Sequence, residues 1–112
     1  MTEYHVTDFL PQDELLAQLA EEAAELAQAA LKLRRVLDGR NPTPVGYQQA
    51  VKQFNEEVAD VQLCLDMISF LDNDTVKRVY GEKHSRWLSR LIEQRIEEER
   101  RKKYAAKNSC DL

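Results

Sequence analysis

Hydrophobic residues recur at steps of three and four through three long segments, and this spacing constrains the fold more than any other feature. The segments span residues 12–39, 45–71 and 76–104. Residues three or four apart share one face of an α-helix, so each segment predicts an amphipathic helix. The chain has only three Gly and three Pro, and good helix formers dominate its composition. The sequence therefore predicts an all-α fold.

The breaks between the segments predict how the helices connect. Gly39 follows the first segment, and the run RNPTP after it cannot continue a helix. Because this connection is short, the first two helices should be antiparallel neighbours. The second break, LDNDT, offers Asp72, Asp74 and Thr75 as candidate N-caps for the third helix. Gly81 weakens that helix locally, by roughly 1 kcal/mol relative to Ala, and allows a kink there.

A chain of 112 residues has the length of one domain. We expect a single domain over residues 1–112, with about residues 105–112 as a flexible tail. The expected architecture is an antiparallel helical hairpin plus a third long helix, in a four-helix-bundle-like core. A helical protein of this size buries only a modest core alone, so we expect oligomerisation to complete it.

Two acidic pairs interrupt the predicted hairpin, in EEAAE at residues 21–25 and EEVAD at residues 56–60. Glu22 and Glu25 share a face of the first helix, and Glu57 and Asp60 share a face of the second. Counted from the connecting loop at about 1.5 Å per residue, both pairs lie roughly 20 Å away. Since packed helices lie about 8–10 Å apart, the four carboxylates converge if both pairs face inward.

Four converging carboxylates repel one another unless a cation lies between them. Ligation by oxygen alone favours a hard divalent ion, Mg²⁺ above all, with Mn²⁺ as a possible substitute. Carboxylate di-iron bundles usually supply Glu-x-x-His pairs, and neither helix contains a His, so iron is disfavoured. The alternative is that the acids are simply solvated, because pairs of Glu on an exposed helix face are common.

The two acidic motifs and their spacing resemble the MazG-like, all-α nucleoside triphosphate pyrophosphohydrolases, in particular the short, phage-type members. That family carries EExxE on one helix and ExxD on the next. Here EExxE matches Glu21, Glu22 and Glu25, and ExxD matches Glu57 and Asp60. The preceding LLAQLA, the hairpin length and the apolar sequence after Asp60 also fit. The resemblance covers about residues 12–72.

The resemblance implies hydrolysis of a nucleoside triphosphate, perhaps a dNTP, between the α and β phosphates, in control of the nucleotide pool. It implies Mg²⁺ held by Glu22, Glu25, Glu57 and Asp60, with Glu21 as an accessory acid. Either Glu21 or Glu22 is a candidate general base. It also implies a homodimer or homotetramer with sites near subunit contacts.

Basic residues on the third helix are candidates for binding the substrate phosphates. Lys83, Arg86 and Arg90 fall at steps of three and four and form one stripe. Lys52 and Arg78 are weaker candidates. Residues 1–72 carry 13 acidic and 5 basic residues, whereas residues 73–112 carry 7 acidic and 11 basic ones. This asymmetry agrees with a site that binds a metal together with a phosphate, and equally with two surfaces that merely attract.

Two other classes of function compete with an enzyme. One is a non-enzymatic helical protein-interaction module with a solvated acidic face. The other, a nucleic-acid binder, is disfavoured because RRKK at 100–103 directly follows EEE at 97–99. No segment has the length of a membrane span and the first residues do not resemble a signal peptide, so we expect a cytoplasmic protein without membrane partners.

Overall fold

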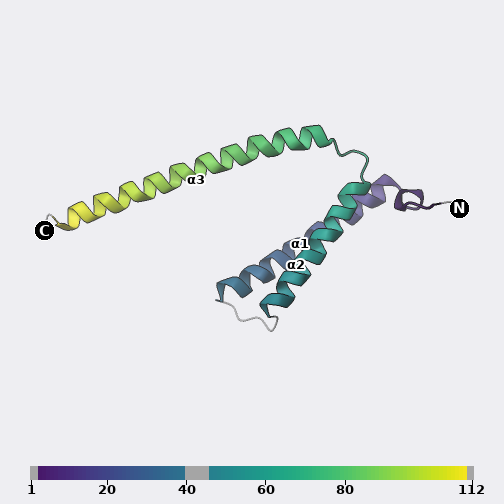
Figure 1. Ribbon diagram of the computed structural model, residues 1–112, viewed down its shortest axis with the longest axis horizontal. Coiled ribbons are helices and arrows are strands. Elements are labelled where there is room, and N and C mark those ends of the chain that lie inside the picture. The colour runs from purple at the N-terminus through teal and green to yellow at the C-terminus, as the bar shows by residue number, and fades with distance from the viewer. Residues whose placement is uncertain (1–2, 40–45, 111–112) are drawn as a thin grey trace. The chain divides into compact units, whose positions relative to one another are not determined.

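The computed structural model describes residues 3–39 and 46–110 and is helical almost throughout these ranges (Figure 1). A short 3-10 helix, η1 (Val6–Asp8), precedes α1 (Gln12–Asp38), α2 (Tyr47–Met67) and α3 (Asn73–Cys110). The described residues contain no strand, so the predicted all-α fold is confirmed. The chain forms two compact units, Met1–Leu71 and Asp72–Leu112. The single domain expected over residues 1–112 stays a prediction.

Helix α1 begins and ends where its local sequence requires. Pro11 adopts an extended conformation before the first turn, and its carbonyl accepts the first helical hydrogen bond from the Leu15 N–H at 3.1 Å. Gly39 ends the helix with φ at 72°, and its N–H donates to the Arg35 carbonyl at 2.9 Å. Glycine adopts this left-handed conformation without a steric penalty, which confirms the predicted stop. The RNPTP loop predicted next falls within residues 40–45, outside the described residues.

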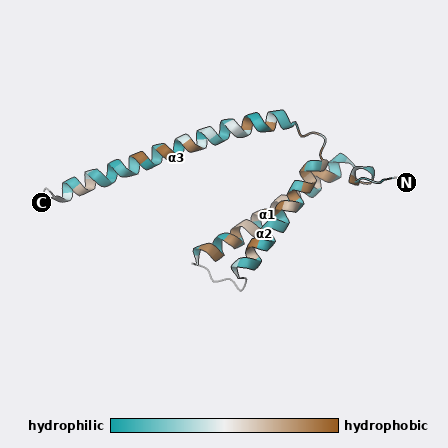
Figure 2. Cartoon of the chain, in the orientation of Figure 1, coloured by the Kyte–Doolittle hydropathy of each residue, from teal (hydrophilic) through white to brown (hydrophobic). Residues whose placement is uncertain are grey.

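Helices α1 and α2 pack side by side as a hairpin (Figure 1). Apolar and polar residues alternate along both helices, as expected for amphipathic helices (Figure 2). The two helices bury small residues against each other, since Ala29 is 4 % exposed and Ala50 only 1 %. Leu15, Cys64 and Ile68 are the other buried residues in the described part of the chain. Small side chains in this core let the two backbones approach closely, which brings the acidic pairs within reach of each other.

Helix α2 ends at Met67 rather than at Leu71, where its hydrophobic pattern predicted the end. Ile68 is extended, with φ at −87° and ψ at 123°. The side chain of Gln12, at the start of α1, holds this end of α2. Its Nε2 donates to the Met67 carbonyl at 3.2 Å, and its Oε1 accepts from the Ser69 N–H at 2.8 Å. These bonds satisfy terminal backbone groups that would otherwise need another helical turn.

Helix α3 begins at the cap formed by Asp72. The Asp72 Oδ1 atom accepts from the backbone N–H groups of Asp74 and Thr75, at 3.2 and 3.3 Å. Its Oδ2 atom accepts from the Thr75 hydroxyl at 2.7 Å. Of the three candidate caps, Asp72 therefore fills the role. The helix runs through Gly81 without a break and continues to Cys110, so residues 105–110, expected to be a flexible tail, are helical.

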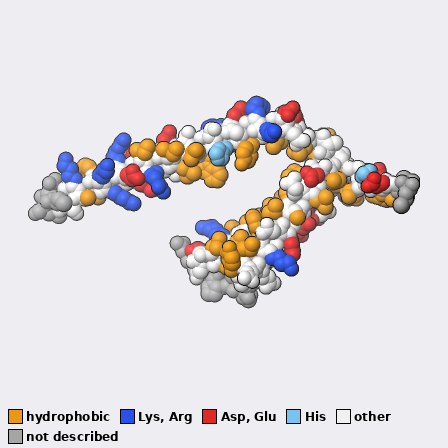
Figure 3. Space-filling model, in the orientation of Figure 1, with side chains coloured by type: hydrophobic (Ala, Val, Ile, Leu, Met, Phe, Trp, Pro, Cys, Tyr) orange, Lys and Arg blue, Asp and Glu red, His pale blue; other side chains and the backbone are white. Residues whose placement is uncertain are grey.

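Both units expose large hydrophobic side chains (Figure 3). Leu31 on α1 is 52 % exposed, and Trp87 on α3 is 64 % exposed. Exposed apolar surface of this kind is a common feature of proteins that associate. The described helices include none that is both long enough and apolar enough to cross a membrane.

Candidate metal centre

The hairpin brings together the four acids that the sequence singled out. One carboxylate oxygen from each of Glu22, Glu25, Glu57 and Asp60 lies within 4.8 Å of the other three. We call these four residues the carboxylate cluster. Helix α1 supplies the first two and α2 supplies the last two. The convergence expected from counting residues back from the loop is therefore present in the structure.

Two of the cluster oxygens are buried without a hydrogen-bond partner. They are the Oε2 atoms of Glu22 and Glu57, one from each helix. The residues themselves are half-buried, whereas Glu25 and Asp60 are exposed. Burying a carboxylate oxygen without a donor costs free energy, and such atoms in folded proteins usually have a partner. A cation between the two helices would supply that partner.

The surroundings of Glu22 alter its pKa in opposing ways. Gln18 Nε2 donates to Glu22 Oε1 at 2.8 Å, and this bond lowers the pKa of Glu22. Desolvation and the charges of Glu25 and Asp60 act in the opposite direction and prevail, so the pKa of Glu22 is raised above its ordinary value. The same environment reaches Cys64: burial, followed by the charges of Glu22 and Asp60, raises the pKa of its thiol.

The spacing of the cluster oxygens suits a divalent cation. Oxygens on opposite sides of Mg²⁺ lie about 4 Å apart, and around Ca²⁺ they lie about 5 Å apart. The observed limit of 4.8 Å falls between these values, so small side-chain rotations would close the set on Mg²⁺. All four donors are carboxylates, which are hard ligands suited to Mg²⁺, Mn²⁺ or Ca²⁺ rather than to softer metals.

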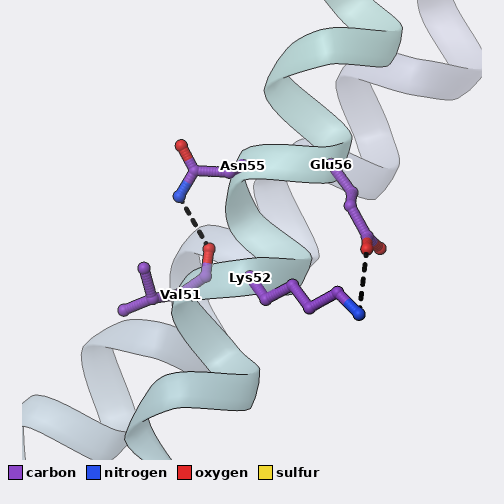
Figure 4. A network of polar contacts seen from close by, with 4 residues as sticks. All are labelled: Val51, Lys52, Asn55 and Glu56. Atoms are coloured by element: carbon purple, nitrogen blue, oxygen red, sulfur yellow. Dashed lines mark hydrogen bonds and ion pairs between the residues drawn. The ribbon is translucent and has the colours of Figure 1, made fainter.

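The acids that neighbour the carboxylate cluster in sequence do not join it. Glu21 is exposed and is not one of the four residues whose oxygens converge, so its accessory or catalytic role stays a prediction. Glu56 is exposed and lies 3.9 Å from the amino group of Lys52 in an i,i+4 ion pair, next to the Asn55–Val51 hydrogen bond (Figure 4). Lys52 is thus paired on an exposed part of α2.

A cavity of about 540 Å³ lies between α1 and α2 and adjoins the carboxylate cluster. Glu25 and Glu57 belong to both. The cavity is also lined by two basic residues of α1, Lys32 and Arg35, which the sequence reasoning missed. The spacing could have revealed Lys32, because it lies seven residues after Glu25 on nearly the same helix face, and Arg35 follows three residues later on the adjoining part of that surface.

The basic stripe predicted to bind phosphate lies on α3, in the second compact unit. Lys83, Arg86 and Arg90 are all exposed. Arg90 Nε donates to the Arg86 carbonyl at 3.5 Å. Arg78, a weaker candidate, forms an ion pair with Glu82 at 3.1 Å. Phosphate binding by these residues stays a prediction.

No family model, no curated protein and no solved structure matches this chain. Assignment of a function therefore depends on the chemistry of the carboxylate cluster and of the cavity beside it.

Proposed function

We propose that this chain is a Mg²⁺-dependent nucleoside triphosphate pyrophosphohydrolase, with Mn²⁺ as a possible substitute for Mg²⁺. The observation that carries the proposal is the convergence of four carboxylate oxygens within 4.8 Å, with one oxygen each of Glu22 and Glu57 buried and unpartnered. The resemblance to the EExxE and ExxD motifs of MazG-like enzymes supports the choice of reaction. Substrates of this class are cytoplasmic metabolites, in agreement with a cytoplasmic protein.

In the proposed reaction, water adds across the anhydride between the α and β phosphates. A phosphorus–oxygen bond forms to water, the bridging bond breaks, and the products are a nucleoside monophosphate and pyrophosphate. Bound Mg²⁺ would offset the charge of the triphosphate and favour ionisation of the attacking water. The carboxylates of Glu22, Glu25, Glu57 and Asp60 would hold the ion, and Glu21 or Glu22 would accept the proton from water.

The exposed hydrophobic residues of the hairpin support assembly into a homodimer or homotetramer. Leu16, Leu31 and Leu63 are each 44 % exposed or more. Burying such residues against a second copy would remove apolar surface from water and complete a bundle. The same exposed surface also favours the competing hypothesis, a non-enzymatic module that binds other proteins through its helices.

A product-resolved screen tests the proposal. The full chain is incubated with a panel of ribonucleoside and deoxyribonucleoside triphosphates and Mg²⁺, and the products are separated. Monophosphate plus pyrophosphate is expected. Diphosphate plus phosphate, or no turnover of any nucleotide, would contradict the proposal and favour the interaction module.

A matched pair of variants links turnover to the carboxylate cluster. Glu57→Gln should abolish turnover, because it removes a charged ligand while keeping the shape of the side chain. Glu56→Gln changes the neighbouring acid, which is exposed and pairs only weakly with Lys52 at 3.9 Å, so it should leave turnover unchanged. Equal effects of the two substitutions on turnover would contradict a role for Glu57 in the site.

A further inference from the structure

We propose that Lys32 and Arg35, in the cavity beside the carboxylate cluster, bind the β and γ phosphates that leave as pyrophosphate. This inference deepens the proposed function and rests on it. It assigns to the hairpin itself an anion-binding subsite, distinct from the basic stripe on α3.

The cavity joins opposite charges within one compact unit. Its walls come from α1 and α2, and they include the acids Glu25 and Glu57 together with the cations Lys32 and Arg35. Its volume of about 540 Å³ lies within the range of about 300–1,000 Å³ that is typical of small-molecule sites. A metal–triphosphate substrate needs both kinds of charge, because carboxylates bind its metal and cations bind its terminal phosphates.

The positions of the two cations along α1 suit a chain of phosphates that extends away from the carboxylate cluster. At about 1.5 Å per residue, Lys32 lies about 10 Å and Arg35 about 15 Å along the helix from Glu25. Side chains on an α-helix lean toward its N-terminus, which here is the direction of the cluster. The long side chains of Lys32 and Arg35 can therefore shorten these separations.

The immediate surroundings of Lys32 leave its charge available for an anion. Lys32 is half-buried, and its Nζ atom lies 3.5 Å from Oε1 of Gln53, a neutral acceptor. Gln53 and Gln28 also line the cavity and offer amide N–H donors. Arg35 would add a guanidinium, which can donate two parallel hydrogen bonds to one phosphate.

A purely structural role is the competing explanation. Arg35 lies in the last turn of α1, where a cation interacts favourably with the helix dipole. Arg34 occupies nearly the same place along the helix but does not line the cavity, so it is a matched control. If Arg35 acted only through the helix dipole, substitutions of Arg34 and Arg35 would have similar effects. If Arg35 binds phosphate, only its substitution would weaken triphosphate binding.

The test compares Lys32→Gln and Arg35→Gln with the control Arg34→Gln in the full chain. For each variant, KM and kcat are measured on the best nucleoside triphosphate, together with the affinity for inorganic triphosphate in Mg²⁺. We expect Lys32→Gln and Arg35→Gln each to raise KM and weaken inorganic triphosphate binding by roughly tenfold or more. Arg34→Gln should match the wild type, and Lys32→Arg should recover part of the lost affinity.

Two further readouts separate the possible failures. Stabilisation by Mg²⁺ alone, measured as a shift in Tm, should persist in Lys32→Gln and Arg35→Gln, because the carboxylate cluster is intact. If both variants bind inorganic triphosphate as tightly as Arg34→Gln does, the phosphate subsite is wrong while the proposed function stands. If the wild type hydrolyses no nucleotide, the proposed function fails. The subsite is then judged by binding of inorganic triphosphate alone. It is overturned if the wild type does not bind inorganic triphosphate, or if neither substitution weakens that binding.

Discussion

Glu22 and Glu57 approach each other from α1 and α2, with an oxygen of each within 4.8 Å, and each also buries its Oε2 atom without a hydrogen bond. Close carboxylates with unpartnered oxygens destabilise a fold that holds no counter-charge. Hydrophobic residues at these two positions would pack with a smaller cost in free energy, yet the hairpin carries a glutamate at both. The relationship between Glu22 and Glu57 therefore makes predictions about stability that do not depend on catalysis.

Substitution of Glu57 by Gln should affect the melting temperature differently with and without metal. Without metal, the variant should melt at the same temperature as the wild type or higher, because one repelling charge is gone. Saturating Mg²⁺ should raise the Tm of the wild type on the order of 10 °C and that of the variant much less. Thermal unfolding followed by circular dichroism, with and without EDTA, measures both effects.

Asp66→Asn is the control for this comparison. Asp66 is an exposed acid of α2 that accepts a hydrogen bond from Gln62 at 3.1 Å and lies outside the carboxylate cluster. The Asp66→Asn substitution should leave the rise in Tm caused by Mg²⁺ unchanged. An equal loss of response in Asp66→Asn would mean that Mg²⁺ acts through general charge screening rather than at the cluster.

The raised pKa of Glu22 makes the stability of the metal-free protein depend on pH. Because the folded pKa exceeds the unfolded one, the favourable contribution of protonated Glu22 is complete below the unfolded pKa and is lost as pH rises through the folded pKa. The Tm difference between Glu22→Gln and the wild type should therefore grow as pH rises from about 4 and then level off. A difference that stays constant over this range would contradict the raised pKa.

The hairpin and the convergence of its acids could be predicted from sequence because both follow from local rules. Hydrophobic spacing predicts the helices, and Gly39 predicts the end of α1. Residue counts predict how far each acidic pair lies from the connecting loop. The early end of α2 could not be predicted in this way. Gln12, which lies 55 residues before Met67 along the chain, supplies hydrogen bonds that no local pattern encodes.

The cationic side of the cavity was missed for a different reason. Lys32 and Arg35 are ordinary residues for the C-terminal half of a helix, where they complement the dipole. Only the packing of α2 against α1 places them in the lining of one cavity with Glu25 and Glu57. The spacing from Glu25 indicates Lys32, seven residues later on nearly the same face, but a helix face becomes a site only when the neighbouring helix is placed.

Replacing Gln12 by Ala should loosen the end of α2. The substitution removes the two hydrogen bonds to Met67 and Ser69, and we expect a loss of about 1–3 kcal/mol in the free energy of unfolding. Chemical denaturation of the full chain measures this loss. Gln48→Ala, at an exposed position of α2, is the control, and an equal loss there would contradict a specific role for Gln12.

Asp72 should stabilise the start of α3 only while it is ionised. Hydrogen bonds from the Thr75 hydroxyl, then from its backbone N–H, lower the pKa of Asp72 below its ordinary value of 3.8. The cap is therefore fully effective above that value and is lost as pH falls through the folded pKa. Asp72→Ala should increase hydrogen exchange at Asp74 to Val76 at neutral pH, whereas Asp72→Asn, which keeps an acceptor oxygen, should increase it much less. Equal exchange in all three proteins would exclude the cap.

Enlarging Ala50 should couple a packing defect to metal binding. Ala50 is 1 % exposed in the core of the hairpin, so Ala50→Leu should force α1 and α2 apart and cost about 1–3 kcal/mol. Because the carboxylate cluster draws two residues from each helix, the same change should also reduce the rise in Tm caused by Mg²⁺. Ala30→Leu, at an exposed position of α1, should affect neither quantity. If Ala50→Leu lowered stability but left the response to Mg²⁺ intact, the ion would not depend on the spacing between the helices, and a site shared by α1 and α2 would be excluded.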